Sequence, residues 1–562
     1  MEIKSKILLA SLSAAAMTAV AADKPNIVVI LADDISAREW PIYGSDTWTG
    51  SKGLDSHDTD FRAKSPVMEQ LAQKGCYMST CWSATVSMPT RAQVMTGRFA
   101  HIQKWWHNGD QGRYKNAEGK QETWPLYESS PLTIGKVAQK AGYATAWSGK
   151  TQMAHTDTNI NNYGFDEGLY TPGDLSNHSS YTDFVMKREK GMPAKTYRVQ
   201  DSGRDVSTYL QVSYYWYPSV MAVNTPENTK KNTMQPWPFS AEDKAKYGVT
   251  TYGPDVEQDF LFDFMERKQK EKKPFFVYHT THLGHDAYNF LNPDSAEKWP
   301  ETPKVEWDGK KYTRTEPKIT GDKGVYDTHG TLSKPGMGAH VTYLDYVIWR
   351  YLQQFKKMGI EKNTVFIITA DNGTSGYGKG SHVSQKGTHV PFLVYAPCLN
   401  MTKKGKVDAL MNLADILPTI AEIAGTEIPK NYEISGESLI PFLTTKQTQH
   451  RDFCYGYKSN YQIIRGNEVL RDGTGKWYDV REYPSDLISF PVITDWSKAT
   501  ESMRKEKAAL LEQMKEFDLY DTAHDGPGGI YKPASKGSVQ KKPATGATGA
   551  NKGNGAKAKA TN

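Results

Sequence analysis

The stretch PNIVVILADD, residues 25–34, sets the fold class of this 562-residue chain. An unbroken apolar run from Ile27 to Ala32 is followed directly by two aspartates. An apolar run of this length with polar residues at one end is typical of a strand buried on both faces of a parallel sheet. Similar runs indicate more strands of that sheet: Tyr143–Trp147, the weakest of them, Pro274–Tyr278, Thr364–Ala370 and Val390–Ala396.

Helical patterns lie between these runs, at Val67–Lys74, Leu132–Ala141, Val341–Met358 and Leu410–Ala424. Because strands and helices alternate, the sequence predicts the α/β class, with a large, mostly parallel sheet sandwiched by helices. Residues 155–255 and 286–335 are less regular and rich in Tyr, Trp, Asn, Lys and Pro. We expect long loops there, over the sheet edge, where substrate selection usually resides.

The pattern changes near residue 446, which divides the chain. Strand-like pieces at Tyr461–Arg465 and Lys476–Val480 and a charged helix at Lys498–Phe517 predict a small α+β subdomain over 446–532. This subdomain follows a large main domain expected over 22–445. Residues 533–562 hold Gly, Ala, Lys and Thr without a large apolar residue, which predicts a disordered tail.

The N-terminus is typical of a secretory signal peptide. Two lysines precede an apolar segment, Ile7–Val20, and Ala19–Ala21 fits a small-residue cleavage site. A signal peptide over 1–21, too short to span a membrane, predicts export to a periplasm or out of the cell. In such an oxidising compartment one or two disulfides are conceivable, and the sequence does not choose among the pairings of Cys76, Cys81, Cys398 and Cys454.

The net charge of +6 fits either a weakly basic surface or a polyanionic substrate. No nucleic-acid-binding module is recognisable, which argues against DNA or RNA as partner. The aromatic run Tyr214–Tyr217 fits either a platform for sugar rings or packing under a loop.

Oxygen-bearing side chains follow two of the expected strands. Asp33 and Asp34 close the first strand, and Asp371 and Asn372 close the strand Thr364–Ala370. In open α/β sheets ligands bind outside the carboxyl ends of the strands. Taken singly, each pair could cap a helix or make a turn. Together, their oxygen ligands predict a site for a hard divalent cation, Ca²⁺ in preference to Zn²⁺, with Mg²⁺ also compatible.

The segment SMPTRAQVMTG, residues 87–97, has the pattern of a short helix. Pro89 suits a first helical turn, so we expect Ser87 or Met88 at the N-cap. A serine there could simply cap the helix. Helix N-termini also favour oxyanions, and Arg91, about one turn along, could bind the same anion. Beside a cation, this arrangement suits a tetrahedral oxyanion ester.

These motifs resemble those of the type I sulfatases, the formylglycine-dependent S1 family of the alkaline phosphatase-like superfamily. Ser87-x-Pro-Thr-Arg91-x-x-x-Met-Thr-Gly97 resembles the family signature in its serine form. The resemblance covers about residues 24–445. The other matching segments are Pro25–Asp34, Ser148–Lys150, Pro274–Tyr278 leading to His285-Asp286, Ala370–Thr374, Gly378–Gly380 with Gly387–Pro391, Asp415–Thr419 and Gly436–Leu439.

The resemblance implies a secreted bacterial sulfatase in which Ser87 is oxidised to formylglycine. An ordinary serine would keep the sulfate as a stable ester, whereas the hydrated aldehyde has a second hydroxyl whose deprotonation expels it. The serine form implies a radical SAM, anaerobic-type maturating enzyme as partner. The resemblance also assigns Ca²⁺ to Asp33, Asp34, Asp371 and Asn372.

The resemblance assigns roles to the remaining site residues too. Arg91 would hold the diol, and Lys150 and Lys379 would neutralise sulfate oxygens. His285 would bind the sulfate and could protonate the leaving alcohol. His279 and His282 compete for that role, although a strand would alternate their faces.

The sequence departs from the family at one position. The family has a histidine two residues after the Gly-Lys lysine, thought to deprotonate the diol, but Gln152 stands there. Glutamine cannot act as a base. His155 could replace the missing histidine if its loop folds back.

Three functions fit these residues. The first is a sulfatase acting on a sulfated carbohydrate such as a glycosaminoglycan, a mucin or an algal polysaccharide. The second is a phosphomonoesterase or phosphodiesterase of the same superfamily that keeps Ser87 as nucleophile. The third is a non-catalytic glycan-binding relative, suggested by Gln152. The retained signature and cation motifs favour the first.

Overall fold

A computed structural model describes residues 24–517 with gaps. The described residues run from 24 to 153 with short gaps after residue 50, cover parts of 160–251, and continue from 252 to 517 without 286, 288–300, 319–327 and 460. The expected signal peptide, the expected tail and His155 lie outside the described residues.

The centre of the molecule is an 11-stranded sheet. Four strands in its middle, β9, β16, β1 and β19, run parallel. The strands in spatial order are β15 (Gln235–Trp237), β14 (Met221–Asn224), β10 (Gly168–Thr171), β9 (Ala144–Lys150), β16 (Phe275–Thr280), β1 (Asn26–Ala32), β19 (Thr364–Ala370), β21 (Phe392–Tyr395), β4 (Cys76–Trp82) and β20 (His389–Val390), with β22 (Gly405–Asn412) also paired to β4.

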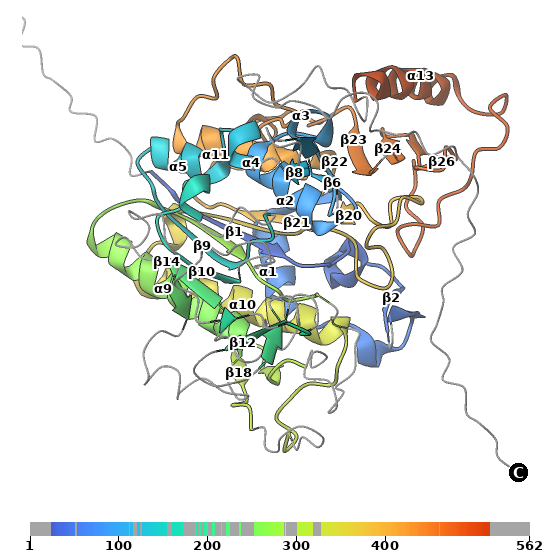
Figure 1. Cartoon of the computed structure of the whole chain (residues 1–562). Helices are drawn as coiled ribbons and strands as arrows, with labels where there is room; N and C mark the ends of the chain where they lie inside the picture. The colour runs from blue at the N-terminus through green and yellow to red at the C-terminus, as the bar shows by residue number, and fades with distance from the viewer. Residues whose placement is uncertain are drawn as a thin grey trace, which may run out of the picture.

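Helices cover both faces of this sheet (Figure 1). Helices α9 and α10 lie on one face, and α2, α5 and α11 on the other. Strands β1, β16 and β19 are buried along their whole length, as the apolar runs require. The main helices are α1 (Pro66–Lys74), α2 (Ser87–Thr96), α5 (Ile134–Lys140), α9 (Gly253–Lys270), α10 (Met337–Met358) and α11 (Ile416–Ala424). The α/β sandwich predicted from the sequence is confirmed.

Three local predictions were wrong. The run Val390–Ala396 forms β20 and β21, which pair antiparallel with their neighbours, because an apolar run does not reveal a strand's direction. The predicted helix Leu410–Ala424 starts late, since Leu410–Asn412 end β22 beside β4. The irregular segment 155–255 also contributes β10, β14 and β15 to the main sheet rather than loops alone.

The C-terminal residues build a separate small layer, seen beside the main sheet in Figure 1. Four antiparallel strands carry one helix, as the sequence predicts: β23 (Cys454–Lys458), β24 (Tyr461–Arg465), β25 (Val469–Arg471), β26 (Trp477–Asp479) and α13 (Glu501–Glu516). The described part of the chain has no helix long and apolar enough to span a membrane. All four cysteines are free thiols in this structure.

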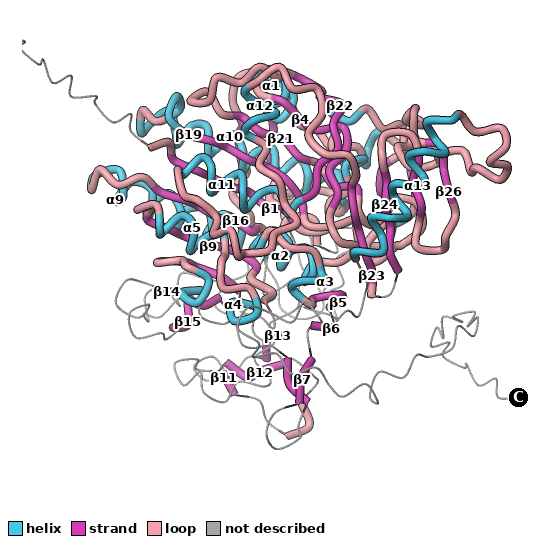
Figure 2. Tube along the Cα trace, turned by 90° about the horizontal axis from the view of Figure 1, so that it is seen from above, coloured by secondary structure: helices cyan, strands magenta, loops and turns pink. Residues whose placement is uncertain are grey.

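Short elements complete the fold, and among them β7, β11 and β12 lie away from the main sheet in Figure 2. They are β2 (Trp48–Thr49), β3 (Asp55–Ser56), α3 (Ala100–Gln103), β5 (Trp105–His107), β6 (Asp110–Gln111), β7 (Arg113–Lys115), β8 (Gln121–Thr123), α4 (Leu126–Ser129), β11 (Met186–Lys187), β12 (Thr196–Val199), β13 (Asp205–Ser207), β17 (Val305–Trp307), β18 (Tyr312–Arg314) and α12 (Ile440–Thr444).

Candidate active site

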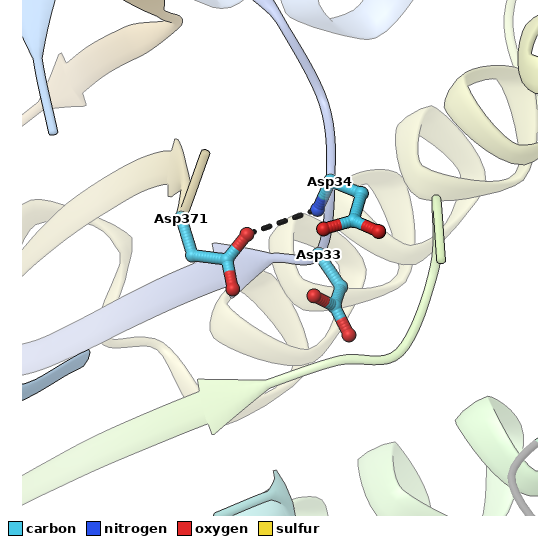
Figure 3. A group of neighbouring side chains, drawn as sticks. All are labelled: Asp33, Asp34 and Asp371. Atoms are coloured by element: carbon cyan, nitrogen blue, oxygen red, sulfur yellow. Dashed lines mark hydrogen bonds between the residues drawn. The ribbon is translucent and has the colours of Figure 1, made fainter. Parts of the chain in front are cut away.

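Three carboxylates meet at the carboxyl ends of two adjacent strands. Strands β1 and β19 are parallel neighbours with Ala32 opposite Ala370, so the residues that follow reach the same edge of the sheet. Asp33, Asp34 and Asp371 are fully buried there, with ligand atoms within 4.8 Å of one another (Figure 3). The Asp34 N–H donates to Asp371 Oδ1 at 2.9 Å. A left-handed φ of 56° at Asp34 turns the chain so that both consecutive aspartates face the cluster.

The cluster fits a hard divalent cation. Asp33 Oδ1 is buried and accepts no hydrogen bond from the described residues. Asn372 adds an amide group, whose nitrogen donates to Asp34 Oδ1 at 2.8 Å. Carboxylate and amide oxygens are the ligands that Ca²⁺ and Mg²⁺ prefer.

Ser87 lies beside this cluster and not at the helix cap. Helix α2 begins at Ser87, and the N-cap is Val86, so the predicted cap position was one residue late. The Ser87 hydroxyl therefore does not cap the helix but donates to Asn372 Oδ1 at 2.9 Å. Asn108 Oδ1 instead accepts from the Met88 N–H at 3.1 Å. Ser87 is held facing the carboxylate cluster at the positive end of a helix.

Three cationic side chains surround the carboxylates. The Arg91 guanidinium is fully buried and contacts Asp371 Oδ2 at 2.9 Å and Asp33 Oδ1 at 3.5 Å. Lys150, at the end of β9, contacts Asp33 Oδ2 at 2.6 Å, and Lys379 contacts Asp34 Oδ2 at 2.6 Å. The structure thus brings together residues that lie more than three hundred positions apart in the sequence, such as Asp34 and Lys379.

The carboxylates respond differently to this environment. Burial opposes the charge of Asp33, but Lys150, His285 and Arg91 hold its pKa well below the ordinary value. Burial raises the pKa of Asp34, and burial with the charge of Asp33 raises the pKa of Asp371 to about 6. Burial lowers the pKa of Lys150. Like charges crowded in a buried site are the condition that a bound dication relieves.

The loop after β16 carries the predicted histidine. His285 Nε2 lies 3.9 Å from Asp34 Oδ2, and the side chain keeps 15% of its surface exposed. The loop is held from beneath by Tyr215, whose hydroxyl donates to the carbonyl oxygens of His282 and His285. Tyr215 is fully buried and stacks on Tyr252, so this member of the run 214–217 packs under a loop and offers no sugar platform.

A buried carboxylate that no sequence motif revealed lies behind this loop. Glu257 of α9 contacts His282 Nδ1 at 3.0 Å and His279 Nε2 at 3.4 Å. Burial raises the pKa of Glu257 and lowers the pKa of both histidines. Glu257 shares the buried face of α9 with Leu261 and Phe264, a helical spacing that could have revealed it.

Gln152 stands where the family has a histidine, two residues after Lys150. Gln152 is half-buried with a left-handed φ of 46°, and its Oε1 is buried without a hydrogen-bond partner in the described part of the chain. His155, the predicted substitute, lies outside the described residues, so its role stays a prediction.

The fold and this constellation define the class of the protein. The profile of the Sulfatase family matches residues 25–426, which is more than half of the chain, so the chain belongs to the sulfatase family. It is a sulfuric ester hydrolase with the alkaline phosphatase-like fold.

Three similar proteins illustrate the match. An arylsulfatase of Clostridium perfringens is 22% identical over 524 residues, covering 88% of this chain and 95% of that protein. An N-acetylglucosamine-6-O-sulfatase of Bacteroides thetaiotaomicron is 22% identical over 500 residues, covering 83% of this chain and 78% of that protein. The solved PsFucS1 sulfatase from Pseudoalteromonas sp. has a TM-score of 0.55 at 19% identity, covering 89% of this chain and 92% of that one.

Proposed function

We propose that this protein is an exported sulfatase that hydrolyses sulfate esters of a carbohydrate through a formylglycine made from Ser87 and a bound Ca²⁺. The observation that carries the proposal is the position of Ser87, whose hydroxyl donates to Asn372 at 2.9 Å beside three buried carboxylates and three cations. A serine that only capped a helix would face its own backbone.

Maturation is an oxidation of the Ser87 side chain. The Cβ–OH group loses two hydrogens, with their two electrons, to a radical SAM maturating enzyme, and the aldehyde then adds water. One hydroxyl of the hydrate attacks sulfur while the sugar alcohol leaves. Loss of a proton from the other hydroxyl then expels sulfate and restores the aldehyde.

The cationic residues bind and orient the reacting groups. Lys150 contacts Asp33 and Lys379 contacts Asp34, so both ammonium groups lie at the carboxylate cluster beside Ser87. Both would neutralise sulfate oxygens. Arg91, anchored by Asp371 and the Lys150 carbonyl, would hold the hydrated Ser87 aldehyde.

Proton transfer to the leaving alcohol falls to His285. Its ring lies at the exposed side of the cluster and 3.9 Å from Asp34, where an incoming ester would meet it. A protonated imidazole can donate to the departing oxygen near neutral pH. The base for the second half-reaction is His155 in this proposal, because Gln152 has no proton-accepting nitrogen.

Asp33, Asp34, Asp371 and Asn372 would hold the cation. When bound, Ca²⁺ would polarise the sulfate group and favour the ionised form of the attacking hydroxyl. Asp33 Oδ1, which is buried and accepts no hydrogen bond from the described residues, supports this ligand set. Mg²⁺ meets the same oxygens but demands a stricter octahedron.

The carbohydrate substrate and the export are proposed on separate grounds. The Bacteroides relative is named for a sulfated amino sugar, and the PsFucS1 neighbour is named a sulfatase. The charged and apolar pattern of residues 1–21 supports a signal peptide and a periplasmic or secreted location.

Sulfate release from 4-methylumbelliferyl sulfate and a panel of sulfated glycans tests the proposal. Protein co-expressed with a serine-type maturating enzyme should release sulfate. Ser87→Ala should be inactive, and Ser87→Cys co-expressed with a cysteine-type maturating enzyme should recover activity. Release of phosphate from 4-methylumbelliferyl phosphate in preference to sulfate would contradict the proposal, as would glycan binding without turnover by protein that carries the aldehyde.

A further inference from the structure

The turn between β23 and β24 brings the C-terminal sheet to the edge of the active site. The Gly380 N–H donates to the Thr85 carbonyl at 2.6 Å, and the Thr85 N–H and hydroxyl donate to the Tyr457 carbonyl at 3.3 and 3.1 Å. Gly380 follows Lys379, and Thr85 lies two residues before Ser87. The end of β23 is therefore tied by backbone contacts to both sides of the site.

A second contact fixes the residue that directly follows β23. The Ser459 N–H donates to the Trp106 carbonyl of β5 at 3.2 Å. Two residues after Trp106, Asn108 accepts from the first turn of α2 at Met88. Hydrogen bonds thus link Ser459 to β5, and the residue that follows β5 to the start of α2 beside Ser87.

Lys458, the last residue of β23, is the charged residue beside this turn. A Cβ built on Gly380 would lie 3.9 Å from Lys458 Nζ and 3.6 Å from Val86 Cγ1, the side chain directly before Ser87. The ammonium group therefore lies over the backbone that follows Lys379. Lys458 is half-buried and forms no ion pair with any acidic side chain of the described residues.

Two histidines border the same ammonium group. Burial and the charge of Lys458 lower the pKa of His107 and of His382. Asp472 is also near His382, but its carboxylate accepts bonds from Thr474 and Tyr478. Because no acidic side chain of the described residues pairs with Lys458, its ammonium group is available to an anion.

An exposed aromatic ring completes this surface. The rings of His382 and Tyr461 stack with centroids 4.0 Å apart at 11°, and Tyr461 remains 40% exposed. Gly473 permits the stack, because a Cβ there would lie 2.9 Å from the Cβ atoms of both residues. An aromatic ring beside a cation is suited to a sugar ring that carries a charged substituent.

We propose that Lys458 is a specificity-determining residue that binds a second anionic group, a sulfate or a carboxylate, on the saccharide whose sulfate ester lies at Ser87. The proposal rests on the proposed function and narrows its substrate class to saccharides with at least two anionic groups. The C-terminal subdomain would thereby select the substrate while the main sheet supplies the chemistry.

Competition against 4-methylumbelliferyl sulfate, which has one anionic group, tests this assignment. The competitors are inorganic sulfate, a carrageenan disaccharide with one sulfate, its counterpart with two sulfates, and a chondroitin disaccharide with one sulfate and one carboxylate. Each inhibition constant is measured for the wild type, Lys458→Met, Lys458→Arg and Lys505→Met. Lys505 is an exposed lysine of α13 and controls for the loss of one positive charge.

The wild type should bind at least one of the two-anion disaccharides more tightly than the one-sulfate disaccharide. Lys458→Met should raise the inhibition constant of that disaccharide about tenfold relative to that of inorganic sulfate, as expected for one charge-assisted hydrogen bond. Lys458→Arg should restore most of the difference. Of the disulfated disaccharide and the disaccharide with a carboxylate, the one with the lower inhibition constant shows whether Lys458 binds a sulfate or a carboxylate.

Three results would overturn the assignment. The inhibition constant of the two-anion disaccharide could change by less than about twofold in Lys458→Met, or it could change equally in Lys505→Met. The third result is a wild type that binds two-anion and one-sulfate disaccharides equally well. Failure of the proposed function is distinguishable. Protein that carries the aldehyde but does not hydrolyse 4-methylumbelliferyl sulfate would contradict the proposed chemistry, and calorimetric titration with the same saccharides would still test Lys458.

Discussion

Replacing Asp415 with asparagine should destabilise the protein strongly, because this carboxylate joins the main sheet to the segment that enters the C-terminal subdomain. Asp415 is fully buried before α11. Both of its oxygens accept from Arg451 Nε at 2.9 Å, and Oδ2 contacts His450 Nε2 at 3.0 Å. The backbone N–H groups of Asn412 and Glu437 also donate to it.

The size of the effect follows from the pKa of Asp415. Burial alone would raise this pKa, but Arg451 and His450 lower it from 3.8 to about 2. A shift of this size corresponds to about 2–3 kcal/mol of stability. Because the folded pKa is depressed, this stability is present above about pH 4 and is lost as the pH falls towards 2. Asp415→Asn also leaves the buried Arg451 without its closest counter-ion, so the total loss at neutral pH should be about 3–5 kcal/mol.

Urea unfolding followed by tryptophan fluorescence measures this loss. The gap in unfolding free energy between the wild type and Asp415→Asn should be about 3–5 kcal/mol at pH 7 and should narrow by about 2 kcal/mol by pH 2.5. The control Asp408→Asn removes an exposed carboxylate of β22 and should change stability by less than about 0.5 kcal/mol. A gap below about 1 kcal/mol at pH 7, or one that does not change with pH, would refute the reasoning.

Three further predictions concern the site. Chelation by EDTA should lower the melting temperature and abolish sulfate release. Added Ca²⁺ should restore both in the wild type but not in Asp371→Asn. A melting temperature that does not change with Ca²⁺ in a thermal-shift assay would count against the cation site. Lys150→Met should lower kcat/KM for 4-methylumbelliferyl sulfate by a factor of about 10²–10³ at equal aldehyde content. The substitution removes the ammonium group that would neutralise the sulfate and leaves Asp33 without its closest counter-ion. A decrease of less than about tenfold would argue against this role. Gly284→Ala should lower both stability and activity, because the φ of Gly284 is 108° and a Cβ there would lie 2.0 Å from the Asp33 carbonyl oxygen. The control Gly359→Ala has a φ of 69° and open space around it, so it should lower the free energy of thermal unfolding by only about 1 kcal/mol.

Sequence patterns were sufficient to predict the acidic side chains of the site, because these residues directly follow strands that the sequence also predicts. The acidic residues after Ala32 and Ala370 could be placed together because parallel neighbouring strands end at the same edge of a sheet. The hydroxyl of Ser87 could be placed near them through the family signature, although its position relative to the helix start was one residue off.

The remaining errors have physical causes. Burial, not strand direction, determines the apolar run of β21, so the antiparallel pairing left no mark in the sequence. The apolar residues at the end of β22 are separated from those of α11 only by single polar residues, Asn412 and Asp415, which hid the boundary at Asn412.

Contacts between distant parts of the chain were out of reach of local patterns. Glu257 meets His282 through the packing of α9 on β16, and Lys458 reaches Gly380 through a hairpin of another subdomain. Such residues carry no motif of their own, because only the tertiary fold brings them to the site.

The mass of the peptide that contains Ser87 tests the central claim most directly. After co-expression with an active serine-type maturating enzyme, the account predicts a peptide lighter by two hydrogens than the encoded sequence, and one that reacts with a hydrazide probe. An unmodified Ser87, in protein made beside a control sulfatase that is fully converted, would contradict the account.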